Sequence, residues 1–71
     1  MAANYSFKKG WRQLPQAKCS EVRKQIMEAL DIKVRTSFYP RLNGEVEPKL
    51  SEARDIERIF KQYGITDVWG E

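Results

Sequence analysis

The sequence contains no histidine and a single cysteine, Cys19. One cysteine cannot form a disulfide within the chain, and a zinc site needs several cysteine or histidine ligands. The chain also lacks the glycine-rich loop that cradles phosphates and the G-x-S-x-G turn of serine hydrolases. These absences exclude the common Cys/His metal sites and leave no constellation for catalysis. We therefore expect no enzyme and no bound cofactor or metal.

Long apolar runs are missing as well. No segment approaches the roughly 18 apolar residues of a membrane span, and the first ten residues lack the apolar core of a signal peptide. With the lone cysteine, this predicts a cytoplasmic protein without a membrane partner. With 71 residues, the chain is expected to form a single domain over 1–71. So small a core leaves no room for an enclosed cavity, so we expect no small-molecule ligand.

Basic residues are concentrated in the first part of the chain. Residues 1–44 carry nine Lys and Arg against three Asp and Glu, whereas residues 45–71 carry four against seven. A basic front and an acidic back suggest one side that faces a polyanion and another that faces solvent or a partner. An ordinary solvated surface would give the same counts, so charge alone does not decide between the two interpretations.

Apolar residues recur at the spacing of a helical face in four segments. The spacing predicts an all-α, compact four-helix fold with helices over about 5–13, 20–30, 36–43 and 51–63. The second helix is expected to bury Val22, Ile26, Ala29 and Leu30, and the last to bury Ala53, Ile56, Phe60 and Tyr63. Ile65, Val68 and Trp69 are then expected to fold back over the core as a C-terminal turn.

Polar residues and prolines indicate where these helices begin. Ser20 is the natural N-cap of the second helix, although Pro15 could open it earlier, and Ser51 is the expected cap of the last. Proline costs about 3 kcal/mol inside a helix but little in its first turn. Pro40 is therefore compatible with a short third helix that is capped at Thr36 or Ser37.

The segment from Leu30 to Phe38, continued by Arg41-Leu42-Asn43-Gly44 and Glu47-Pro48, resembles the phage-repressor (Cro-like) helix-turn-helix family. That family tends to read Leu-Gly-Ile-Ser, then a short recognition helix, then Asn-Gly and a proline. Asp31 stands where the family has its turn glycine, and it can adopt the same left-handed conformation. The resemblance covers the chain from Val22 to about Leu50. It implies a repressor-like transcription regulator of bacterial phages or mobile elements.

In such a fold the third helix enters the DNA major groove with its N-terminal residues on the bases. Arg35 is the first candidate for base contact, because a guanidinium can bond guanine O6 and N7 together. Arg41 is as suited to a phosphate as to a base, and Tyr39 either lies flat on the protein or reaches a phosphate. The candidate DNA-binding residues are Arg35, Thr36, Ser37, Tyr39 and Arg41, with Lys33, Asn43, Lys8 and Lys9 as phosphate ligands.

Two functions follow from these residues. The first is sequence-specific binding of double-stranded DNA. A homodimer is expected on DNA, since one short helix cannot alone reach the roughly 10⁻⁸–10⁻¹¹ M of specific binding. The second is a protein–protein interaction module, an adaptor or inhibitor, that uses the same helices. It predicts an exposed apolar patch around Tyr39 and Trp69 and no affinity for duplex DNA.

Overall fold

The computed structural model describes residues 5–70 of the chain. Four α-helices follow one another, α1 (Lys8–Arg12), α2 (Gln16–Ala29), α3 (Phe38–Asn43) and α4 (Leu50–Lys61), and a short 3₁₀ helix, η1 (Arg35–Ser37), leads directly into α3. No strand occurs between residues 5 and 70, so the predicted all-α fold of four helices is confirmed. None of these helices is long and apolar enough to cross a membrane.

The starts of two helices differ from the prediction. Pro15, with an extended backbone, occupies the N-cap position of α2, so this helix begins at Gln16, near the earlier of the two predicted starts and not after Ser20. Helix α4 begins one residue before Ser51, because Lys49 is its N-cap residue and the Glu52 carboxylate accepts the Lys49 backbone N–H at 2.9 Å. No serine hydroxyl caps either helix: Pro15 forms no side-chain cap bond, and at α4 the Glu52 carboxylate reaches back to the N-cap backbone.

Helix α1 is shorter than predicted, since it begins at Lys8 and not near Tyr5. The Phe7 N–H donates to the Leu42 carbonyl at 3.2 Å, so the chain just before α1 is bonded to the end of α3. The buried Ser6 hydroxyl donates to the same carbonyl at 2.9 Å. These bonds join the N-terminal segment to α3 before the first helix starts.

Three phenylalanines from different parts of the chain meet at the centre of the molecule. The Phe7 ring lies 6.0 Å from Phe38 and 6.1 Å from Phe60, in edge-on and tilted arrangements that favour aromatic pairs. Of the predicted stripe on α2, Val22, Ile26 and Leu30 are buried, whereas Ala29 is exposed. The buried apolar core consists of Phe7, Leu14, Val22, Ile26, Leu30, Phe38, Leu42, Ile56, Ile59, Phe60, Ile65 and Val68.

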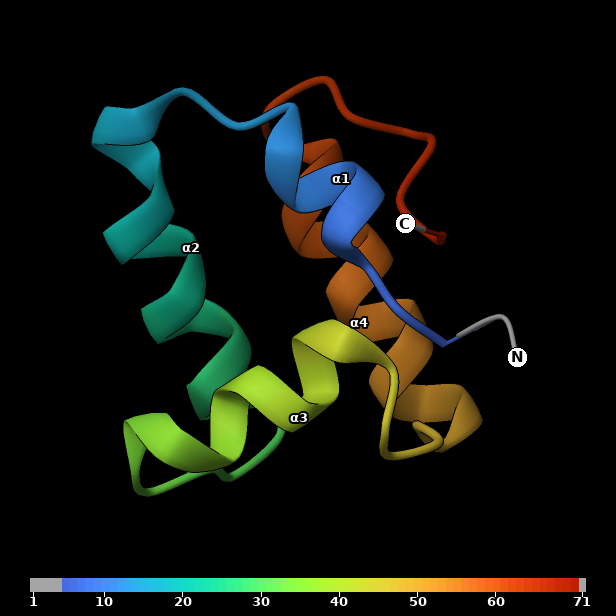
Figure 1. Ribbon diagram of the computed structural model, residues 1–71. Coiled ribbons are helices and arrows are strands. Elements are labelled where there is room, and N and C mark those ends of the chain that lie inside the picture. The colour runs from blue at the N-terminus through green and yellow to red at the C-terminus, as the bar shows by residue number, and fades with distance from the viewer. Residues whose placement is uncertain (1–4, 71) are drawn as a thin grey trace.

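A tight turn joins α2 to η1 and α3. Asp31 has a φ of 56°, in the left-handed region as the sequence predicted, and Ile32 N–H donates to the Met27 carbonyl at 2.8 Å. In Figure 1, α2 packs beside α4 while α3 crosses the end of α2 at a steep angle. Gly44, with a φ of 83°, ends α3 in the predicted left-handed conformation.

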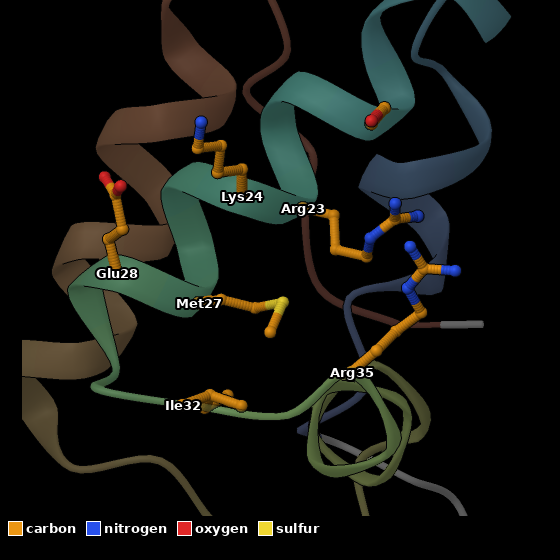
Figure 2. A pocket seen from close by; sticks show the side chains of 7 residues that line it. Arg23, Lys24, Met27, Glu28, Ile32 and Arg35 are labelled. Carbon is orange, nitrogen blue, oxygen red and sulfur yellow. The ribbon is translucent and has the colours of Figure 1, made fainter.

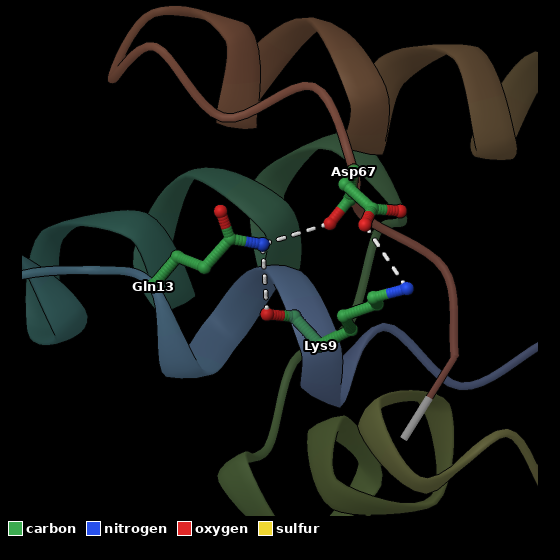
Figure 3. A network of polar contacts seen from close by, with 3 residues as sticks. All are labelled: Lys9, Gln13 and Asp67. Carbon is green, nitrogen blue, oxygen red and sulfur yellow. Dashed lines mark hydrogen bonds and ion pairs between the residues drawn. The ribbon is translucent and has the colours of Figure 1, made fainter.

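The C-terminal segment folds back along α1, as predicted. Ile65 and Val68 are buried, and Gly10 N–H donates to the Val68 carbonyl at 3.0 Å. Figure 3 shows Lys9 paired with Asp67 at 3.0 Å, while the Gln13 amide donates to the Asp67 carbonyl at 2.9 Å. A Cβ on Gly10 would lie 3.1 Å from the Val68 Cα, so glycine allows this close approach.

Candidate nucleic-acid interface

A groove of about 440 Å³ lies between the outer side of α2 and the start of η1. In Figure 2 the side chains of Arg23 and Arg35 extend from these two elements and lie side by side. Met27 and Ile32 supply apolar surface beside the two arginines, to their left in this view. Two neighbouring guanidinium groups make this groove suited to an anion. Its lining residues are Ser20, Arg23, Lys24, Met27, Glu28, Ile32 and Arg35.

Helical spacing explains how α2 contributes to the groove. Ser20, Arg23, Lys24 and Met27 stand at i, i+3, i+4 and i+7, on one face of the helix. The Asp31 turn then brings Arg35, the first residue of η1, against the same face. The sequence reasoning missed Arg23 and Lys24 as site residues, although their spacing from Met27 could have identified this polar face.

The groove is electropositive because its cations are not neutralised by the protein. Within residues 5–70, no hydrogen bond or ion pair engages the side chains of Arg23, Lys24 or Arg35, whereas five other cations each pair with a carboxylate. Glu28 is the one acidic residue among those lining the groove. Arg35 is exposed and Arg23 is partly buried. Arginine side chains without a partner in the protein can bond an incoming phosphate or base edge without first breaking such a contact.

Beyond the groove, the outer edge of η1 and α3 exposes polar side chains. Arg35, Thr36 and Ser37 are exposed, and Tyr39 keeps 42% of its surface accessible while its ring packs edge-on against Phe38. Ser37 takes the N-cap position of α3, but its hydroxyl forms no capping bond, because η1 carries helical backbone through this position. Arg35, Thr36, Ser37 and Tyr39 are hereafter called the recognition edge.

The other predicted site residues do not join this edge as unpaired groups. Lys33 pairs with Asp31 at 3.0 Å, and the Asn43 amide donates to Glu45 at 3.4 Å. Arg41 pairs with Glu52 at 3.0 Å and is only 20% exposed. Lys9 of α1 pairs with Asp67 at 3.0 Å, and neither Lys8 nor Lys9 lines the groove. The structure therefore brings together four of the nine predicted residues.

Comparison of the chain with protein-family models, with curated proteins and with solved structures finds no match. The fold defines a small all-α protein, and the assignment of a function depends on the geometry and charge of the surface described above.

Proposed function

We propose that this protein binds double-stranded DNA in a sequence-specific manner and acts as a transcriptional regulator of phage or mobile-element type. The observation that carries this proposal is the pair of unpaired arginines, Arg23 and Arg35, at the junction of the groove and the recognition edge. A short turn and a steeply crossing second helix are the arrangement with which helix-turn-helix proteins present side chains to the major groove.

The two arginines take different roles in this proposal. Arg35 begins the recognition edge and reads a guanine through O6 and N7, while Thr36, Ser37 and Tyr39 contact neighbouring bases or the sugar–phosphate chain. Arg23 and Lys24, on the helix that crosses the backbone, bind phosphates and fix the register without reading sequence. Binding as a homodimer on a two-part site would bring the affinity into the range of specific regulators.

The first prediction compares two double variants of equal charge in a salt titration of duplex binding. Arg23→Ala/Arg35→Ala is expected to lower the affinity by about tenfold or more, because it removes one phosphate ligand and one base ligand. It should also flatten the dependence of log K on log salt, by roughly 1 for each lost phosphate contact. The measurement is fluorescence anisotropy of a labelled duplex.

The matched control is Arg54→Ala/Lys61→Ala. Both side chains are exposed on α4, which contributes no residue to the groove. This control should retain wild-type affinity apart from a small general effect of net charge. Equal losses in the two double variants, or wild-type binding that ignores salt, would contradict the proposal.

A second candidate function, a protein–protein interaction module, is favoured by exposed apolar side chains near the α2–α3 turn. Val34 is 55% exposed and Val46 is 40% exposed, and both line a shallow groove with Pro40. Trp69 contributes less to such a patch than the sequence suggested, because it is partly buried and its indole N–H donates to Glu57 at 2.6 Å. An interaction module would keep its partner when Arg23 and Arg35 are replaced.

A further inference from the structure

Helix α3 is bonded to the rest of the molecule at its C-terminal end. The Leu42 carbonyl accepts hydrogen bonds from the Ser6 hydroxyl and the Phe7 N–H, at 2.9 and 3.2 Å. One residue earlier, the Arg41 guanidinium donates to a Glu52 carboxylate oxygen at 3.0 Å. The N-terminal end, where the recognition edge lies, has no comparable bond to another element among residues 5–70.

The Arg41–Glu52 pair differs from the surface ion pairs of this protein. Both side chains are largely buried, at 20% and 18% exposure, whereas the members of the Lys33–Asp31 pair are each 83% exposed. The same Glu52 oxygen that accepts from Arg41 also accepts the Lys49 backbone N–H at 2.9 Å. One carboxylate thus joins the end of α3 to the first turn of α4.

A helix of six residues needs such a connection. Isolated helices shorter than roughly 12–15 residues are marginal in water, and α3 has six residues with a proline, which has no N–H, at the third. Its orientation is therefore set by its contacts with other elements. Phe38 and Leu42 fix which face is buried. The bonds to the Leu42 carbonyl and the directional bond from Arg41 to α4 then restrict rotation and translation of the helix along that face.

We propose that Arg41 contributes to DNA recognition as a positioning residue, which sets α3 against α4 through Glu52, and that it binds neither base nor phosphate. This inference rests on the proposed function and revises one residue of the predicted DNA contact. It makes Glu52, an acidic residue that no DNA contact would favour, a requirement for tight binding.

The test uses single variants of both partners and their combination. Glu52→Gln keeps an oxygen for the Lys49 N–H but removes the charge, and Arg41→Gln removes the guanidinium. Each is expected to weaken duplex binding by about tenfold, and the double variant by no more than either, as for residues that act through one contact. All variants are measured below their thermal unfolding transitions, so that loss of folded protein does not contribute.

Amide hydrogen exchange of the free protein provides a readout that does not require DNA. Both single variants should exchange faster at residues 38–43, with the protected amides of α2 and α4 unchanged. Asp55→Asn is the matched control, because Asp55 lies on the same helix and forms an exposed pair with Arg58. It removes one negative charge and should leave both the affinity and the exchange of α3 unchanged, or raise the affinity slightly.

Three results would overturn the inference. Tighter binding by Glu52→Gln together with weaker binding by Arg41→Gln would show that Arg41 is a DNA ligand, which the carboxylate only opposes. Unchanged exchange in α3 would show that the pair does not hold this helix. A wild-type chain that binds no duplex overturns the proposed function and, with it, the role in recognition, and faster exchange in the variants would then show that the connection itself is real.

Discussion

At the scale of single residues, Gly10 is the position where a local rule and a tertiary contact disagree. Glycine inside a helix costs about 1 kcal/mol relative to alanine, and the sequence alone gives no reason for it. In the structure, the Val68 Cα and carbonyl oxygen lie 3.1 and 3.3 Å from where a Cβ would stand. Because three hydrogen bonds hold this segment on α1, the backbone of Val68 cannot easily retreat.

Gly10→Ala is therefore expected to destabilise the protein. Overpacking typically costs about 1–3 kcal/mol, which exceeds the gain in helix propensity of about 1 kcal/mol, so we expect a net loss of about 1 kcal/mol. Gly64→Ala is the comparison, since that position has a φ of +77° and no atom within 4 Å, and its loss would come from backbone conformation alone. Urea unfolding measures both, and a more stable Gly10→Ala would refute the packing argument.

At the scale of elements, the connection between α3 and α4 depends on a charged carboxylate. The hydrogen bond from the Lys49 N–H, and then the hydrogen bond and charge of Arg41, hold the pKa of Glu52 below its ordinary value of 4.5 against the opposing effect of burial. A group whose pKa is lowered by folding stabilises the protein above its unfolded pKa. That stability is lost as the pH falls below 4.5 through the lowered pKa.

The lowered pKa of Glu52 leads to a prediction for the pH dependence of unfolding. The difference in free energy of unfolding between wild type and Glu52→Gln should be constant at neutral pH and shrink below pH 4.5. The reason is that protonated Glu52 and glutamine carry the same charge. Urea unfolding of both proteins across this range measures the difference. A difference in unfolding free energy that persists or increases in acid would show that Glu52 is not the group that titrates.

At the scale of the whole molecule, periodic apolar residues were sufficient to predict the fold. The stripe of Ile56 and Phe60 was readable because burial repeats with the helical period, and the fold-back was readable because Ile65 and Val68 are apolar residues beyond the predicted helix end at Gly64. The starts of helices were less predictable: the sequence left Pro15 and Ser20 open for α2, and it indicated Ser51 where Lys49 is the N-cap of α4. These boundaries depend on backbone geometry and on a carboxylate three residues along.

The candidate site was only partly predictable for a different reason. The four residues of the recognition edge lie within positions 35–39, so the sequence indicated them directly. Arg23 lies twelve positions before Arg35, and their meeting depends on the Asp31 turn. The involvement of Arg41 with Glu52 likewise depends on how α3 meets α4. Contacts between elements decide which cations remain unpaired. These contacts cannot be read from the local sequence around each residue.

Selection of bound duplexes from a random pool tests the central claim most directly. Sequence-specific binding predicts enrichment of a short motif that contains a guanine, and a repeated motif if two copies bind together. The same selection with Arg35→Ala should lose the preference at that guanine while the flanking positions keep theirs. A pool that shows no enriched sequence after selection with the wild-type protein would contradict the account.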